Sequence, residues 1–156
     1  MDEITTLIAR YQLEPLPHEG GWVRRYYESE ERDATGRAHA SAIHFLLSAE
    51  NFSALHRLTI PEAWTWSEGA PVELLQLDPI AGGRLVVLGP DHAAGQLATC
   101  TVPCNVWQGA RSLGAWTLVD CALQPAWRPE DFTLGERVQL LREFPQWAVE
   151  IARLIR

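Results

Sequence analysis

The chain begins with a pattern of apolar positions that repeats at helical spacing. One apolar stripe is formed by Ile4, Leu7, Ile8 and Tyr11. Asp2 stands just before this stripe, and aspartate is a residue type that caps helix amino termini. Pro15 and Pro17 follow the stripe and cannot continue a helix. The pattern therefore predicts a helix over residues 3–12.

Beyond residue 21 the pattern changes to short apolar segments with turn residues between them. These segments lie near residues 22–28, 40–48, 53–60, 62–67, 71–78, 83–88, 96–102, 106–110 and 115–123. Close spacing of short strands favours an antiparallel sandwich or barrel over alternating strands and helices. We therefore expect a mainly β fold, with the barrel at about residues 21–125.

The last part of the chain returns to helical spacing. Its apolar face is formed by Leu140, Leu141, Phe144, Trp147, Ile151 and Leu154. We expect helices over about residues 134–155, divided into two by Pro145. Internal repeats and linkers are absent from the sequence, so residues 1–156 are expected to form a single domain.

Charge and cysteine content narrow the range of partners. The net charge is −7, and an acidic surface repels phosphate backbones, so a nucleic-acid partner is not expected. No apolar run reaches the roughly 20 residues that a membrane-spanning helix needs. The amino end lacks the features of a signal peptide. The three cysteines have no metal-type spacing, which favours free thiols and a cytoplasmic protein.

The segment HRLTIPEAWTWSEG resembles the first sequence motif of the cupin superfamily. His56 takes the position of the first histidine, Glu62 that of the glutamate and Gly69 that of the closing glycine. Leu58 occupies the position of the second histidine, and Glu50 stands where the motif has its leading glycine. Three of these five positions therefore match, at the family's spacing.

The segment PCNVWQ resembles the second cupin motif. Pro103 matches its proline, Asn105 replaces its glycine, and Gln108 replaces its histidine. Asparagine tolerates left-handed backbone geometry, so it can serve in a turn where glycine is usual. In metal-binding cupins the four ligand positions carry three imidazoles and a carboxylate, whereas here one is aliphatic and one is a neutral amide.

The whole chain resembles a cupin subfamily of uncharacterised function, often called cupin type 5. The resemblance starts at PHEGGWVRRYY (residues 17–27) and continues through AIHFLL (residues 42–47) and EAW (residues 62–64) to the carboxyl-terminal helix. It implies a jelly-roll barrel, or double-stranded β-helix, with an amino-terminal helix and carboxyl-terminal helices. The chain departs from the family pattern at three positions. Arg25 stands where the family usually has a glutamate, Thr65 where it has a histidine, and Ala70 where it has an acidic residue.

The resemblance implies that the motif residues point into the barrel, because residues two apart on a strand share a face. The expected pocket residues are His56, Glu62, Trp64, Trp66 and Gln108. A set of one histidine, one glutamate and one glutamine binds divalent transition metals weakly. We therefore expect no firm metal site, and His56, Glu62 and Gln108 as the ligands if a metal does bind.

Three functions are compatible with these residues. The first is a metal-independent isomerase or epimerase that acts on a carbohydrate-like or ring-containing small molecule. In it, His56 would be the base, Glu62 its partner, and Tyr26 or Tyr27 the acid. The second is a metal-dependent enzyme. The third is a non-catalytic ligand-binding protein or structural homodimer, joined through the strands near 22–28 and 40–48. The sequence alone does not decide whether the protein is an enzyme.

Overall fold

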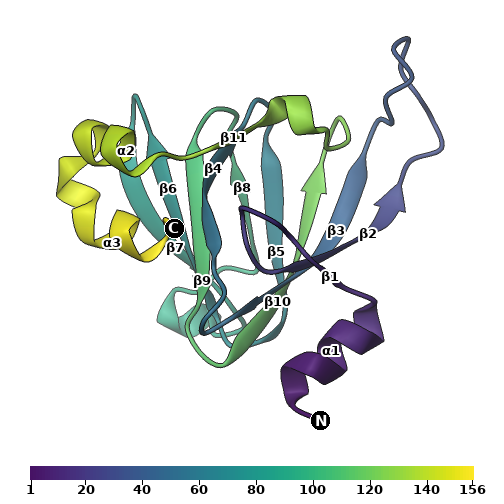
Figure 1. Cartoon of the computed structure of the whole chain (residues 1–156), viewed down its shortest axis with the longest axis horizontal. Coiled ribbons are helices and arrows are strands. Elements are labelled where there is room, and N and C mark those ends of the chain that lie inside the picture. The colour runs from purple at the N-terminus through teal and green to yellow at the C-terminus, as the bar shows by residue number, and fades with distance from the viewer.

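The computed structural model describes residues 1–156 and contains two antiparallel β-sheets that face each other (Figure 1). The six-stranded sheet contains, in spatial order, β1 (Glu14–Pro15), β2 (Trp22–Glu28), β3 (Ser41–Ser48), β10 (Trp116–Leu123), β5 (Glu62–Gly69) and β8 (Thr99–Val102). The five-stranded sheet contains β11 (Phe132–Leu134), β4 (Ser53–Leu58), β9 (Trp107–Ser112), β6 (Val72–Asp78) and β7 (Gly82–Leu88). Strands distant in sequence are neighbours in both sheets, as in a jelly roll. The predicted mainly β fold with flanking helices is confirmed.

Helix α1 (Glu3–Tyr11) lies at the amino end and packs on the six-stranded sheet (Figure 1). The carboxylate of Asp2 accepts a hydrogen bond from the backbone N–H of Thr5 at 2.8 Å, which caps the helix as predicted. Leu7 packs against Leu46 and Leu118 on the outer face of the sheet. The helix therefore covers one part of that face and leaves the rest exposed.

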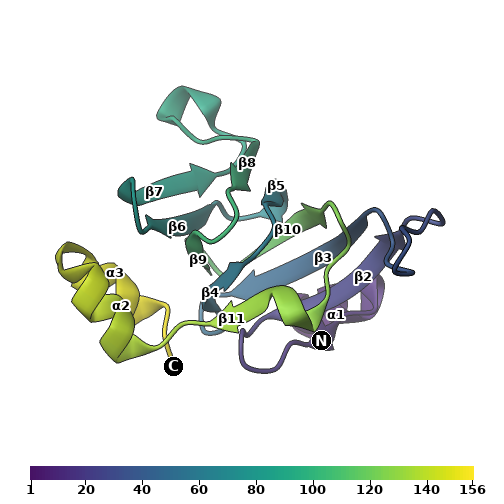
Figure 2. The same ribbon diagram turned by 90° about the horizontal axis from the view of Figure 1, so that it is seen from above.

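The carboxyl-terminal residues form α2 (Arg137–Glu143) and α3 (Ala148–Arg153), separated at Pro145 as the sequence predicted. Figure 2 shows both helices beside the five-stranded sheet, at the opposite end of the molecule from α1. Their apolar side chains pack with Leu75 and Trp107 from that sheet. Since Trp107 faces the helices, the next residue, Gln108, faces the barrel interior. Three single 3₁₀ turns complete the chain, at His92–Ala94, Pro129–Asp131 and Pro145–Trp147.

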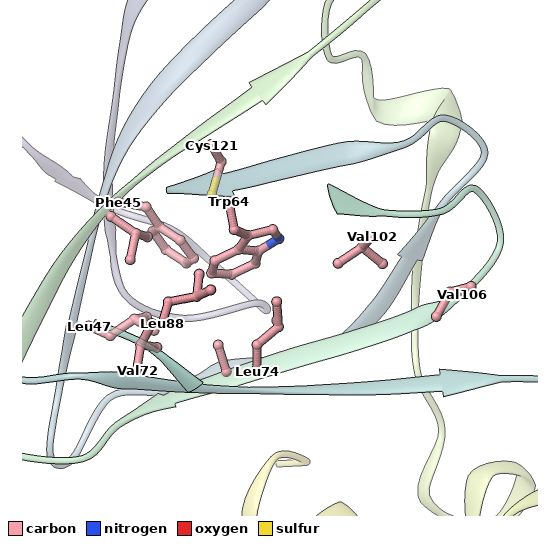
Figure 3. Packing of buried hydrophobic residues seen from close by; sticks show 11 residues of the cluster. Phe45, Leu47, Trp64, Val72, Leu74, Leu88, Val102, Val106 and Cys121 are labelled. Atoms are coloured by element: carbon pink, nitrogen blue, oxygen red, sulfur yellow. The ribbon is translucent and has the colours of Figure 1, made fainter. Parts of the chain in front are cut away.

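Apolar side chains from both sheets fill one part of the barrel interior. The cluster consists of Phe45, Leu47, Trp64, Val72, Leu74, Leu88, Val102, Val106, Ala110, Val119 and Cys121. Figure 3 shows the indole of Trp64 in the middle of this cluster, between Phe45 and Val102. Each large side chain of this kind contributes roughly 1.5–3 kcal/mol when it is fully buried. The rest of the barrel interior borders this packed region.

The strands extend further along the chain than the sequence indicated. They run from Glu14 to Leu134, whereas the barrel was expected at about residues 21–125. Strand β11 was not predicted: only three residues long, it pairs with β4 and completes the five-stranded sheet. A run so short carries too little alternation to be recognised.

Strand β3 pairs with β2 on one side and β10 on the other, so it offers no free edge. Two residues of β1 also cover the start of β2. Pairing of two copies through β3 is therefore not available, and a homodimer stays a prediction. No helix of the structure has the length and apolar character needed to cross a bilayer.

Candidate functional site

A cavity of about 510 Å³ opens between the two sheets, within the size range of small-molecule sites. Ten of its eighteen lining residues are hydrophobic. Phe45, Trp64 and Cys121 belong both to the cavity wall and to the apolar cluster of Figure 3, so they separate the cavity from the packed core. The rim is formed by exposed residues, which are Pro17, His18, Arg25, Trp127 and Pro129.

His56 lies on β4 and is 2% exposed. Its Nδ1 is 2.7 Å from the backbone oxygen of Ala54. A carbonyl oxygen only accepts hydrogen bonds, so Nδ1 carries the proton and Nε2 of the neutral ring has a free lone pair. Nε2 is 3.8 Å from a carboxylate oxygen of Glu19, and the ring stacks on Phe132 at 5.2 Å between centroids. The imidazole is thus held in one orientation, with its basic nitrogen unbonded.

Glu19 lies in the loop before β2, and three contacts fix that loop to neighbouring elements. Its carboxylate accepts a hydrogen bond from the hydroxyl of Ser53 at 2.7 Å, and its backbone oxygen accepts one from the N–H of Ala54 at 2.7 Å. The guanidinium of Arg156 also donates to this backbone oxygen, at 2.7 Å. Gly21 has φ 76°, and a Cβ there would lie 2.6 Å from the ring of Phe45. The tight glycine turn therefore lets Glu19 reach His56.

Glu62 is the first residue of β5, lines the same cavity, and is 7% exposed. Burial raises the pKa of its carboxyl group to about 8, and the nearby carboxylate of Glu19 adds to the rise. Hydrogen bonding by the side chains of Trp64 and Gln108 lowers this pKa, but by less than burial raises it. Glu62 is therefore mostly protonated at neutral pH, and it can donate a hydrogen bond or a proton to a molecule in the cavity.

The structure places some of the residues expected in the pocket on the cavity wall and others away from it. His56, Glu62 and Trp64 line the cavity. Gln108 does not, because its side-chain oxygen accepts a hydrogen bond from the indole nitrogen of Trp64 at 2.7 Å. Trp66 lies further along β5, where its indole nitrogen donates to the backbone oxygen of Ala70 at 3.1 Å.

The two tyrosines considered as acids both lie outside the cavity. Tyr27 is half exposed and borders a separate surface depression beside the loop at residues 29–40. Tyr26 is also half exposed and stacks on His44, on the outer face of the six-stranded sheet. Neither hydroxyl is placed to exchange a proton with a ligand bound beside His56.

The cavity residues do not fit a divalent transition metal. No group of three or more histidine, cysteine, aspartate or glutamate side chains is arranged to hold one. The side-chain oxygen of Gln108 accepts a hydrogen bond from the indole of Trp64, and Leu58 supplies no donor atom. A metal needs deprotonated ligands and several donors at once. We therefore derive no step through a metal.

Sequence reasoning did not identify Glu19, Phe132 or Arg25 as parts of the site, although all three line the cavity. For Glu19 the sequence does carry a signal, which is an acidic residue directly before a Gly-Gly turn. For Phe132 there was none, because its strand was not recognisable. Arg25 was noted only as a departure from the family pattern.

Comparisons with known proteins agree with this architecture. A solved structure of a protein from Shewanella oneidensis is 30% identical, with a TM-score of 0.93 over 100% of this chain and 99% of that one. A hypothetical protein from Leishmania major is 26% identical, with a TM-score of 0.89 over 99% of each chain. No curated protein matches the sequence.

More distant structures show the fold alone. A cupin 2 conserved barrel domain protein from Rhodopseudomonas palustris is 15% identical, with a TM-score of 0.64 over 92% of this chain and 89% of that one. Oxalate decarboxylase from Bacillus subtilis is 10% identical, with a TM-score of 0.60 over 91% of this chain and 37% of that one. The architecture is thus that of a cupin barrel.

The family model described as "Cupin superfamily (DUF985)" matches residues 5–135, which is most of the chain. The chain belongs to this family, and the resemblance seen in the sequence is confirmed.

Proposed function

We propose that the cavity binds a small carbonyl-containing organic molecule and moves a proton on it without a metal, as isomerases and epimerases do. The observation that carries this proposal is the pairing of a buried protonated acid, Glu62, with a buried imidazole whose basic nitrogen is free. A carboxyl group with a raised pKa and an imidazole nitrogen with a free lone pair can serve as the acid and the base of one reaction. Both groups line one cavity of suitable size.

In the proposed reaction, Nε2 of His56 removes a proton from the carbon next to the carbonyl group. The electron pair moves onto the carbonyl oxygen, which takes a hydrogen bond or the proton from the carboxyl group of Glu62. The carboxylate of Glu19, 3.8 Å from Nε2, stabilises the imidazolium that forms. Return of the proton from His56 to the original carbon regenerates the substrate. Its return to the former carbonyl carbon, while the carboxylate of Glu62 takes the proton of the hydroxyl on the carbon that was deprotonated, moves the carbonyl group and gives an isomer.

Glu62 takes the role of acid that the sequence suggested for Tyr27. The change follows from position, since Tyr27 lies outside the cavity and Glu62 lies inside it. The apolar wall around the acid–base pair favours this chemistry, because a low-dielectric site strengthens the interaction with charge that develops on the carbonyl oxygen.

The experiment is deuterium incorporation from heavy water into a panel of ketosugars and cyclic ketones, followed by proton NMR. We expect exchange at the carbon next to the carbonyl with the wild-type protein, and loss of exchange with His56→Gln. Exchange that persists in the presence of a chelator would exclude the metal-dependent alternative. No exchange with any member of the panel would contradict catalysis and leave a ligand-binding protein.

A further inference from the structure

Arg25 is the one residue with a permanent positive charge among those that line the cavity. It lies on β2, two residues after Val23, so both side chains point toward the cavity while Arg24 points to the outer face. The side chain of Arg25 is 36% exposed, which places its charge at the rim.

The guanidinium of Arg25 is held in place by a loop that borders the same rim. Its Nη2 donates a hydrogen bond to the backbone oxygen of Trp127 at 3.1 Å, and its charge lies 5.9 Å from the centre of the Trp127 ring. The backbone N–H of Trp127 in turn donates to the hydroxyl of Ser41 at 2.9 Å. The guanidinium and the indole therefore form a fixed pair, with further N–H groups of Arg25 left to bind a ligand.

The charges along the cavity are unevenly distributed. At the inner end, Glu62 is protonated at neutral pH, and the carboxylate of Glu19 already accepts a hydrogen bond from Ser53. At the outer end stands the guanidinium of Arg25. The only carboxylate close to it is Glu28, at 3.7 Å, which also accepts a hydrogen bond from Arg32 at 3.1 Å. A ligand that fills the cavity therefore meets the neutral acid of Glu62, an imidazole and the carboxylate of Glu19 inside, and a cation at the rim.

We propose that Arg25 selects ligands with a single negative charge, a carboxylate, at the end that faces the rim, and that Trp127 packs against the adjoining apolar part. One guanidinium matches one carboxylate in charge and in geometry, whereas a phosphate dianion requires more cations than the cavity offers. The proposal names the substrate class of the proposed isomerase, so it rests on ligand binding in this cavity. It does not require that the bound molecule reacts.

The test uses two fluorescent probes with the same aromatic framework, the anionic anilinonaphthalene sulfonate and the uncharged phenylnaphthylamine. We expect the wild-type protein to bind the anionic probe more tightly. Arg25→Gln should weaken that binding by about tenfold, the size expected for loss of one charged hydrogen bond, and should leave the neutral probe unchanged. Arg24→Gln is the matched control, and neither probe should respond to it.

Two further arms refine the result. Glu28→Gln should strengthen binding of the anionic probe by about twofold, because it removes a competing surface carboxylate. Phenylpropionate should displace the anionic probe more effectively than phenyl phosphate does, and the reverse order would overturn the assignment of a carboxylate.

Equal affinity of the wild-type protein for both probes, or the same response to Arg25→Gln and Arg24→Gln, would overturn selection by Arg25. Failure of the deuterium exchange described above would leave these binding ratios intact. The two proposals can therefore fail separately.

Discussion

Two of the protein's histidine–carboxylate pairs lie in contrasting places, one inside the barrel and one on the outer face of the six-stranded sheet. Outside, His44 Nδ1 lies 2.6 Å from the carboxylate of Asp120, with the side chains 25% and 34% exposed. Inside, His56 Nε2 lies 3.8 Å from Glu19, with the side chains 3% and 13% exposed. The shorter contact is on the surface, where water screens it, so distance alone does not locate the functional site.

The two histidine–carboxylate pairs differ in how far their surroundings bury them. His44 is stacked on Tyr26 at 4.0 Å, meets Tyr11 edge-on at 5.2 Å, and sits on an open sheet face. His56 is enclosed with Glu62, which is neutral at physiological pH, and a cavity adjoins both. Burial of titratable groups costs desolvation free energy, whereas an exposed pair has little effect either way.

The largest effect concerns the pH dependence of stability. The pKa of Glu62 is about 8 when folded and 4.5 in its ordinary state, so the folded protein holds this proton more tightly than the unfolded chain does. The contribution is fully present below pH 4.5 and is lost as pH rises to about 8, by roughly 5 kcal/mol at most. Glu62→Gln should flatten this fall in urea unfolding measured at several pH values.

Glu68→Gln is the control for that series, because it removes a carboxylate near the surface that pairs with no histidine. It should leave the slope of stability between pH 4.5 and pH 8 as in the wild-type protein. An unchanged slope in Glu62→Gln would show that Glu62 is ionised when the protein is folded, and would remove the acid from the proposed mechanism.

The next effect concerns proton transfer. His56→Gln should lower the rate of deuterium exchange by about a hundredfold or more, the range expected for loss of a general base. His44→Gln should leave the rate within about twofold, since His44 touches no part of the cavity. Both rates are measured by proton NMR on the same substrate. A similar loss in both variants would mean that the outer pair acts on the reaction through the fold.

A third prediction compares two hydrogen bonds of equal length, one inside and one outside. Gln108 accepts from the indole of Trp64 at 2.7 Å in the interior, and Glu68 accepts from the hydroxyl of Tyr11 at 2.7 Å near the surface. Gln108→Leu should reduce the free energy of unfolding by about 2 kcal/mol, because it leaves a buried N–H without a partner.

The matched variant on the surface is Glu68→Leu. It should cost less than about 1 kcal/mol, because water can bond to the freed hydroxyl of Tyr11. Both values come from urea unfolding at pH 7. Equal losses would show that the outer contact is as shielded from water as the inner one.

The smallest effect is expected for the outer pair itself. His44→Gln should change the free energy of unfolding by less than about 1 kcal/mol, as for other partly exposed ion pairs. Thermal unfolding at low and high salt would measure it, and a larger loss that salt does not reduce would show that the stack of Tyr26 on His44 is a main support of the sheet.

The fold could be predicted from the sequence because its signals are local. Helical spacing before Pro15, the series of short apolar segments and the break at Pro145 all depend on neighbouring residues. Strand β11 was not predicted because three residues are too few to show an alternation of apolar and polar positions. The pairing of β3 along both edges depends on strands distant in sequence, so no local pattern could indicate it.

The site was predictable only as far as one motif extends. His56 and Glu62 share a motif, and the structure places both on the cavity wall. Glu19 and Arg25 come from the segment at residues 17–27 and Phe132 from the carboxyl-terminal part, and only the three-dimensional arrangement brings them to the cavity. Trp66 and Gln108 followed the correct alternation along their strands, but alternation gives the direction of a side chain and not its depth within the barrel.

The contact between Arg156 and Glu19 has a consequence for how the protein is made. The two residues are 137 positions apart, and the guanidinium of Arg156 also bonds to the side chain of Asn51 and the backbone of Phe52. During synthesis the Glu19 loop therefore cannot make this contact until Arg156 has been added, 137 residues later. A nascent chain that has already folded its strands would still lack this clasp. Ribosome-bound intermediates should consequently expose the Glu19 loop to proteases until Arg156 has emerged.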